Sequence, residues 1–313
     1  MGEMPEFGGE KMWFWLSLTA LIFWSGSDLF SKIGCQDSSD RYSHLKMVSA
    51  VGIVMGLHAG WQILFGGVAL TGQVLLTYLP VSLLYILSMA LGYFGLRFIE
   101  LSISSPICNS SGAVAAILIF AFGGLAGTSA VELIAVALVC AGVVLLGAVE
   151  SREDAEERKH RQELAGRTYP KTWLALAIPL MYCLLDALGT FADSRVLMVL
   201  DEDAANTAYE LTFLITGLVC AIYVRLIKHE KFQLRKGLPR YLGALCETAG
   251  QYAYVYALAD TEHAAPAAAI ISSYCAATVV WGRVFLKEKL TWKHYACIAL
   301  IVIGITALGF FDG

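Results

Sequence analysis

The sequence predicts an all-α membrane protein with ten transmembrane helices, arranged as two inverted five-helix repeats. Three observations lead to this prediction. The 313 residues are 58% hydrophobic and only 15% charged, with a mean hydropathy of +0.65, whereas soluble domains are about 25% charged. Apolar runs long enough to cross a bilayer recur along the whole chain, and the first half of the sequence returns in the second half at a nearly constant offset.

The apolar runs set the number of predicted spans. A helix of about 20 apolar residues crosses the hydrocarbon core of a bilayer. Such runs lie at 12–33, 46–66, 79–99, 102–122, 131–149, 172–192, 207–227, 240–259, 264–285 and 292–311. The very short connections after residues 99 and 259 predict two tight helical hairpins. The first run has neither a basic segment before it nor a small-residue cleavage site, so we expect a retained span and not a signal peptide.

The basic residues predict the orientation of these spans. Twenty of the 22 Lys and Arg residues fall in every second connection, and only Lys11 and Arg195 fall on the other side. Short loops rich in Lys and Arg face the cytoplasm. We therefore expect a multi-pass protein of the plasma (inner) membrane with both termini outside. The mixed-charge connection 150–171 would be a cytoplasmic, solvated linker between the repeats 1–149 and 172–313, with a regulatory contact as the minor alternative.

The repeat is visible in matched segments. WLSLTALIFWSGSD (15–28) and WLALAIPLMYCLLD (173–186) both begin Trp-Leu and both end on an Asp, and residues 137–147 align with 299–309, which superposes Gly142 on Gly304. Each copy has an odd number of spans, so the second copy enters the membrane from the opposite side. Inverted repeats of this kind are typical of secondary transporters, which bind their solute near the midplane between the repeats.

Two longer motifs resemble a known family. SSPICNSSGAVAA (104–116) and APAAAIISSYCAATVVWGRVFLKEKLTWKHYACIALIVIGI (265–305), with the glycines that end the fifth and tenth spans, resemble the drug/metabolite transporter superfamily, EamA type. The resemblance implies a plasma-membrane carrier for a small organic solute, with a cavity lined mainly by spans 1, 3, 4, 6, 8 and 9. Commonly described members have both termini in the cytoplasm, whereas the charge distribution here predicts both termini outside.

Polar groups inside the spans give the candidate site, because ionisable side chains in hydrocarbon are costly and usually functional. The carboxylates could face the cavity, although Lys32, one turn after Asp28, leaves an ion pair as the alternative. Glu247, Gln251 and Tyr254 form a polar stripe on one face of a predicted helix, which could bind the solute or a proton or could be a hydrogen-bonded packing contact. The aromatic residues could form a box around a cation or could have packing roles only. Asn109 could line the cavity as a polar group or could form a hydrogen bond between packed helices. The predicted solute-binding residues are Trp24, Asp28, Asn109, Tyr182, Asp186, Glu247, Gln251, Tyr254 and Tyr274.

Other residues receive structural interpretations. We expect His58 to be an interior histidine with a satisfied hydrogen bond. Gly52, Gly56 and Gly60 form a small-residue stripe that favours close helix packing within the fold, with a homodimer face as the alternative. The eight scattered Cys residues are interpreted as small hydrophobes. No catalytic residue, metal site, cofactor or nucleic-acid partner is expected.

The functional hypotheses follow from these charges. No Lys or Arg falls in the middle of a predicted span, which argues against phosphorylated solutes because phosphate needs a basic partner. The first hypothesis is therefore a secondary transporter of neutral, zwitterionic or cationic metabolites of amino-acid type, working by alternating access. Carboxylates that titrate near neutral pH would couple transport to protons. The second is an organic-cation carrier for choline-like or amine solutes. A membrane-embedded enzyme or a receptor is a remote alternative.

Overall fold

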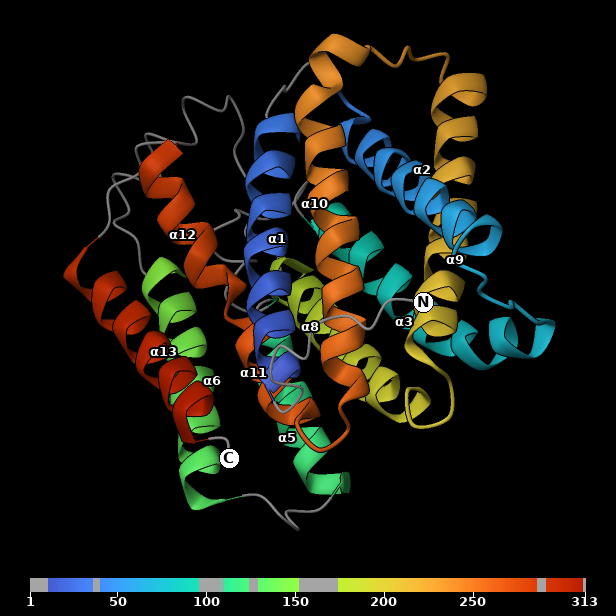
Figure 1. Cartoon of the computed structure of the whole chain (residues 1–313). Helices are drawn as coiled ribbons and strands as arrows, with labels where there is room; N and C mark the ends of the chain where they lie inside the picture. Colours follow the sequence, from blue (N-terminus) through green and yellow to red (C-terminus); the bar gives the residue numbers. More distant parts are fainter. Residues whose placement is uncertain are drawn as a thin grey trace.

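The computed structural model describes residues 11–35, 40–95, 108, 110–123, 129–151, 174–285 and 291–311, and every regular element in these ranges is a helix (Figure 1). Prediction and structure therefore agree on the all-α class. The longer helices are α1 (Met12–Cys35), α2 (Ser43–Leu64), α3 (Gly72–Gly95), α5 (Ser111–Gly123), α6 (Ala130–Ser151), α8 (Leu174–Val196), α9 (Glu202–Ile222), α10 (Leu234–Ala259), α11 (Ala264–Ser272), α12 (Tyr274–Phe285) and α13 (Trp292–Phe311). A short π-helical segment, Tyr223–Ile227, extends α9.

Nine predicted spans each overlap one of these helices, and the span 264–285 covers both α11 and α12, but several boundaries differ. α3 begins at Gly72 and not at residue 79, and α10 begins at Leu234 and not at residue 240. The α9 helix begins at Glu202 because Asp201 caps it, with its side chain accepting a hydrogen bond of 3.0 Å from the Ala204 N–H. Polar first turns of this kind lie outside an apolar run, so a count of apolar residues misses them.

By length and composition, four helical stretches in the described part of the chain can cross a membrane: Ser43–Leu64, Gly72–Met89, Glu202–Ile227 and Ala264–Gly282. Shorter apolar helices lie at Ser111–Phe122, Ala130–Leu146 and Trp292–Leu308. The count of ten spans stays a prediction. The hairpin after residue 259 is present, since α10 ends at Ala259 and α11 begins at Ala264, whereas the connection after residue 99 lies outside the described residues, as does linker segment 152–171.

The helices pack mainly in pairs that are distant in sequence. The most extensive contacts join α1 to α10, α2 to α9, α6 to α13 and α3 to α8, and α5 packs against α11. In Figure 1, α1 and α10 run side by side through the middle of the molecule, with α2 and α9 on one side and α6 and α13 on the other. The centre of the molecule is therefore formed by helices from both halves of the chain.

Glycines set the closest approaches between these pairs. A Cβ atom added to Gly52 on α2 would lie 2.6 Å from the Phe213 carbonyl oxygen and 2.8 Å from the Cα of Gly217 on α9. Added to Gly56, it would meet Leu214 at 2.6 Å, but at Gly60 it would meet nothing within 4 Å. The interpretation as close packing within the fold is confirmed for Gly52 and Gly56 but not for Gly60.

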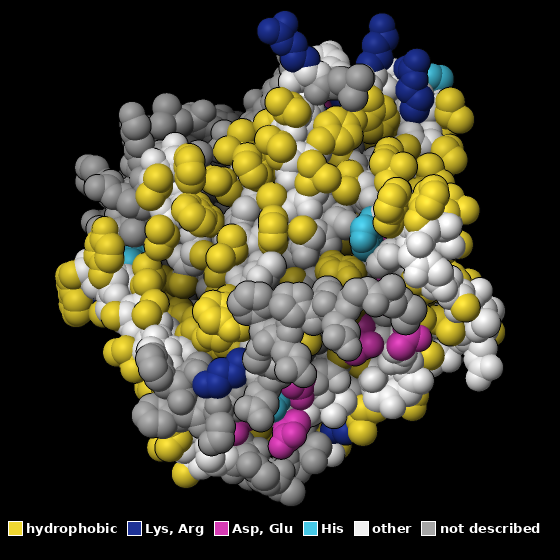
Figure 2. Space-filling model, in the orientation of Figure 1, with side chains coloured by type: hydrophobic (Ala, Val, Ile, Leu, Met, Phe, Trp, Pro, Cys, Tyr) yellow, Lys and Arg dark blue, Asp and Glu magenta, His cyan; other side chains and the backbone are white. Residues whose placement is uncertain are grey.

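The surface carries an apolar band between two differently charged ends. Figure 2 shows hydrophobic side chains over most of the visible face, a group of dark blue Lys and Arg at the upper end, and magenta Asp and Glu toward the opposite end, with some dark blue near them. Basic residues exposed beyond α9 include Arg225, Lys228 and Lys231, and the acidic residues Asp201 and Glu262 are exposed in the connections before α9 and after α10. An apolar band with charged residues beyond each edge is typical of a membrane protein, whose charged residues lie where the protein meets water.

Candidate solute site

An aromatic cluster joins α1, α10 and α12. The Trp24 ring lies 5.0 Å from the ring of Tyr254 and 6.0 Å from that of Tyr274, measured between centroids. Trp24 can lie this close to α10 because Gly250 has no side chain, and a Cβ there would approach the indole Cδ1 to 2.5 Å. The indole N–H of Trp24 is buried without a hydrogen-bond partner among the described residues. The three rings therefore form an aromatic surface that includes an unused donor.

Carboxyl groups from three helices lie beside this cluster. Glu247 on α10 is close enough to Asp28 on α1 and Asp186 on α8 for their charges to interact. Thr278 Oγ1 on α12 donates to Asp28 Oδ2 over 3.4 Å, and Ser88 Oγ on α3 donates to Asp186 Oδ1 over 3.5 Å. Like charges this close repel each other in a medium of low dielectric constant. The cluster is therefore suited to binding positive charge or protons.

The partners of these carboxyl groups are hydroxyls. Besides Ser88, the hydroxyl of Ser111 approaches Asp186, and that of Ser27 approaches Glu247. Within the described part of the chain, neither Asp186 nor Glu247 forms an ion pair with a Lys, Arg or His. Asp28 is solvent-accessible, and the side chain of Lys32 lies outside the described residues, so the predicted choice between ion pair and cavity is not decided there.

Tyr182 and Gln251 complete the predicted set. Tyr182 is partly buried on α8, close enough to interact electrostatically with Asp28, Asp186 and Tyr274. Gln251 is 3% exposed on α10, and its Nε2 has no hydrogen-bond partner in the described part of the chain. Asn109 lies outside the described residues. The structure thus brings seven predicted residues into one connected cluster and places Gln251 one turn from two of them, Glu247 and Tyr254.

A deeper group of residues was missed by the sequence analysis. Asp193 on α8 is completely buried and accepts a hydrogen bond of 2.8 Å from the hydroxyl of Tyr78 on α3. The hydroxyl of Tyr85 contacts that of Tyr254 and donates to Thr190 Oγ1 over 3.3 Å. Asp193 was overlooked because the predicted span ended at residue 192, although α8 continues to Val196. Its spacing of seven residues from Asp186, two helical turns on one face, was the available signal.

His58 lies outside this cluster, on the other side of α10. Its Nδ1 lies 2.8 Å from both carboxyl oxygens of Glu210 on α9. The Glu210 side chain is fully buried, whereas that of His58 is 32% exposed. The predicted hydrogen bond of His58 is confirmed, although its side chain is only partly buried, and the pair joins α2 to α9.

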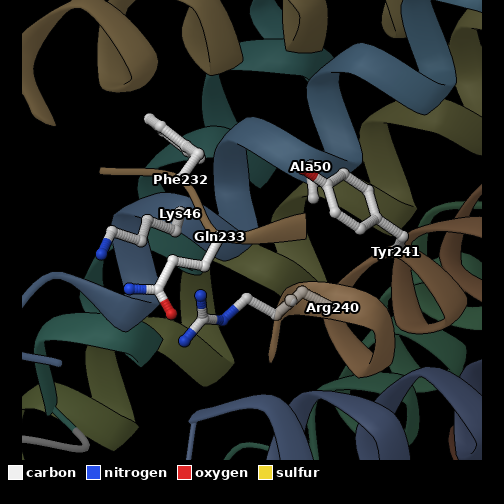
Figure 3. A pocket seen from close by; sticks show the side chains of 7 residues that line it. Lys46, Ala50, Phe232, Gln233, Arg240 and Tyr241 are labelled. Atoms are coloured by element: carbon white, nitrogen blue, oxygen red, sulfur yellow. The ribbon is translucent and has the colours of Figure 1, made fainter. Parts of the chain in front are cut away.

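A separate pocket at the basic end is lined by two residues that form ion pairs, Lys46 and Arg240. Asp40 joins Lys46 and Arg240, each at 2.9 Å, and Arg240 Nε also donates to the Gly34 carbonyl over 3.0 Å. Figure 3 shows the polar ends of Lys46, Gln233 and Arg240 on the same side of this pocket. Burial acts to raise the pKa of Asp40, but the hydrogen bonds and charges of Lys46 and Arg240 outweigh it and keep the pKa below its usual value. Because both cations are already paired, this pocket is a poor site for an anion.

The described residues contain neither a cluster of metal-binding side chains nor a disulfide. Those residues contain no group of three or more His, Cys, Asp or Glu side chains that could hold a metal ion. The cysteines that the structure describes with their side chains are all free thiols, and Cys183, Cys275 and Cys297 are buried. The site therefore offers carboxyl, hydroxyl and aromatic groups, which suit the binding of a solute.

Comparison with known proteins adds a family match over part of the chain. No curated protein matches the sequence. A solved structure titled "Crystal structure of protein" matches with a TM-score of 0.66 at 12% identity, over 96% of this chain and 97% of that chain. This likeness concerns the fold alone. Residues 195–310, which hold α9 to α13, match the sequence model described as the EamA-like transporter family.

Proposed function

We propose that this protein is a secondary carrier of small organic solutes in a plasma (inner) membrane. The match of residues 195–310 to a transporter family supports this proposal, as do the apolar helices and the apolar band between two charged ends. The convergence of Asp28, Asp186 and Glu247 on the aromatic cluster is the observation that carries it. With the basic end in the cytoplasm, both termini would be outside and segment 150–171 would be cytoplasmic.

The helix pairing supports two inverted repeats. If the second repeat copies the first, α1 corresponds to α8 and α3 to α10, and the pairing of α1 with α10 then predicts that of α8 with α3. Both pairings are observed. The pairs of α2 with α9, α5 with α11 and α6 with α13 would each join a helix to its own counterpart. Such a contact pattern is expected when two halves are related by a two-fold axis in the membrane plane.

Glycine contacts between α6 and α13 support the same relation at residue level. A Cβ on Gly142 would meet Ile301 at 2.5 Å, and a Cβ on Gly304 would meet Val139 at 2.6 Å. The sequence offset that superposes Gly142 on Gly304 also superposes Val139 on Ile301. The two contacts are therefore images of one another. We propose that the halves exchange conformations and expose the site alternately to each side of the membrane.

The composition of the site favours a cationic solute over a neutral one. Trp24, Tyr254 and Tyr274 offer ring faces, and Asp28 and Glu247 lie beside them. A ring face attracts a cation by about 0.5–2 kcal/mol, most strongly when water is excluded. We therefore place the organic-cation hypothesis, with choline-like or amine solutes, ahead of neutral and zwitterionic solutes. Return of protons through the carboxyl groups would compensate the transported charge.

Uptake into vesicles tests the proposal. Purified protein in proteoliposomes should accumulate radiolabelled choline, and tetramethylammonium should compete, whereas uncharged sugars should not. If uncharged or anionic solutes are transported and quaternary ammonium solutes neither move nor compete, the cation assignment is wrong. If no solute crosses the bilayer but one is released chemically altered, the protein is an enzyme and not a carrier.

A variant pair locates the site. Asp186→Asn removes one charge from the carboxyl cluster without changing the size of the side chain, and we expect it to reduce choline uptake at least tenfold. Asp201→Asn is the matched control, because Asp201 is exposed and Asn also caps a helix. Both variants should elute and melt like the wild type. Equal uptake by wild type and Asp186→Asn would exclude this carboxyl group from the site.

A further inference from the structure

Asp193 has the burial of an interior hydrophobe and the chemistry of an acid. Its residue exposure is 0%, and it lies on α8 seven residues after Asp186. Seven residues are two helical turns, so both carboxyl groups lie on the same face of α8, about 10 Å apart along the helix axis. Asp193 therefore lies two turns beyond Asp186 toward the C-terminal end of α8, on the side of this helix that faces α3 and α10.

Its hydrogen bonds leave one carboxyl oxygen unused. Tyr78 on α3 donates to Oδ1 over 2.8 Å. The hydroxyls of Tyr85 and Tyr254 also approach the carboxyl group, but only the Tyr78 bond has full hydrogen-bond geometry. Oδ2 has no hydrogen-bond partner in the described part of the chain. Burying a charged carboxyl oxygen without a hydrogen-bond partner costs free energy. A proton on Oδ2 lowers this cost because it neutralises the carboxyl group.

No cation faces Asp193 from the described elements around it. From α3 it meets Tyr78 and Tyr85, and from α10 it meets Tyr254. The Tyr209 ring on α9 packs on the first two of these tyrosines, at 6.3 and 5.8 Å.

The other charged or polar groups nearby contact residues other than Asp193. On α8 itself, the guanidinium of Arg195 lies 5.2 Å from the ring centroid of Phe191, and its NH1 donates to Met198 Sδ over 3.8 Å. From α5, which also packs against α8, the hydroxyl of Ser111 is directed to Asp186. Asp193 is thus surrounded by neutral hydroxyl groups.

Tyr254 connects this acid to the solute site. Its hydroxyl contacts that of Tyr85 and approaches Asp193, while its ring lies against Trp24 in the aromatic cluster. We propose that Asp193 is a proton-binding site behind the solute site, and that Tyr254 couples the two. This inference rests on the proposed carrier function, which it deepens by naming the group that takes the proton.

The chemistry is one reversible proton transfer. In the anionic state, Asp193 accepts the hydrogen bond of Tyr78, and the hydroxyls of Tyr85 and Tyr254 lie near its carboxyl group. When an Oδ2 lone pair takes a proton, an O–H bond forms, the charge is lost, and the carboxyl becomes a weaker acceptor. The hydroxyls of Tyr85 and Tyr254 are then free to reorient, which alters the ring surface offered to the solute. Release of the proton to the other side restores the anion.

Two measurements on the full-length protein in liposomes test the inference. Infrared difference spectra between acidic and neutral pH should show C=O bands of protonated carboxyl groups, and Asp193→Asn should remove one band, which Asp201→Asn should keep. In the second measurement, an imposed pH gradient should accelerate choline uptake by the wild type. In Asp193→Asn, the ratio of uptake with the gradient to uptake without it should fall to about one. Asp193→Glu should restore both signals in part.

The outcomes separate this inference from the proposed function. If wild-type uptake responds to the gradient and Asp193→Asn responds equally, or if Asp186→Asn alone removes the infrared band, the inference is wrong and the carrier proposal stands. If a sodium gradient drives uptake in place of a pH gradient, Asp193 is not a proton site. If no solute is transported at all, the carrier proposal fails, and loss of the band in Asp193→Asn would still identify the proton site.

Discussion

The contact between α2 and α9 offers a direct test of the fold, through Gly52→Ala. The added Cβ would lie 2.6 Å from a carbonyl oxygen and 2.8 Å from the Cα of Gly217, whereas carbon atoms pack at about 3.5–4.0 Å. Both neighbours are backbone atoms, so no rotamer change relieves the clash, and the helices must separate by about 1 Å. Overpacking of this kind costs about 1–3 kcal/mol.

Gly60→Ala is the matched control, because it lies on the same helix and its Cβ would meet nothing within 4 Å. Both substitutions gain helix propensity, about 1 kcal/mol in water, so the difference between them isolates the packing cost. We expect Gly52→Ala to be less stable than Gly60→Ala by about 1–3 kcal/mol. Unfolding by SDS in mixed micelles, followed by circular dichroism, measures this difference.

The partner position sharpens the test. A Cβ on Gly217 would meet the Cα of Gly52 at 2.9 Å, so one separation of the helices relieves both clashes. The double variant should therefore cost less than the sum of the single variants. Equal stability of Gly52→Ala and Gly60→Ala, or full additivity in the double variant, would refute the close approach of α2 and α9.

Three further predictions concern the basic end, the histidine pair and the aromatic cluster. Asp40→Asn leaves buried Arg240 without its counter-charge and Lys46 with only the longer pair to Glu230, at 3.8 Å, and should cost about 3–5 kcal/mol in the same SDS titration. Because the pKa of Asp40 is lowered in the folded protein, its contribution is complete above about pH 4 and is lost as the pH falls through that lowered pKa. His58→Phe leaves Glu210 buried without its partner and should also cost about 3–5 kcal/mol, of which Glu210→Gln in the same chain should restore part. Trp24→Leu should raise the KM for choline about 2–30-fold, whereas Trp61→Leu, at an exposed ring, should leave it unchanged.

Each of these predictions has a contradicting result. Wild-type stability that stays constant down to pH 2, or an Asp40→Asn variant as stable as wild type, would exclude the ion-pair role. An equal loss in His58→Phe with and without Glu210→Gln would show that the histidine acts through packing alone. An increase of KM in Trp61→Leu as large as that in Trp24→Leu would remove the specific role of the buried ring.

Much of the architecture was predictable because hydrocarbon imposes simple rules on sequence. Spans must be apolar for about 20 residues, and the rare acids inside them are conspicuous, so Asp28, Asp186 and Glu247 could be selected as site residues. Tyr254 could be proposed because it shares a helix face with Glu247, and Tyr274 because it lies deep in a predicted span. The structure brings these side chains together from α1, α8, α10 and α12.

The missed residues share a physical cause. Ser27, Ser88 and Ser111 are nearly neutral in a hydropathy count, so nothing in the sequence marks them as partners of carboxyl groups. Tyr85 could not be distinguished from a lipid-facing or interfacial aromatic residue without its neighbours. Asp193 fell just beyond a span boundary that had been placed by apolarity alone, yet the helix continues through it. Side-chain hydrogen bonding across helices is a three-dimensional property that linear spacing does not encode.

The ion pairs of Asp40 with Lys46 and Arg240 have a consequence for energetic balance. The offsets that superpose Gly56 on Gly217 and Pro80 on Pro239 also superpose Lys46 on Thr207 and Arg240 on Val81. Neither Thr207 nor Val81 carries a charge. The glycine contacts between α6 and α13 would be unchanged if the halves exchanged conformations, but these ion pairs would not be reproduced at the opposite end. The two end states of such an exchange are therefore unequal in free energy. Without solute, the protein would favour the conformation in which Asp40 pairs with Lys46 and Arg240.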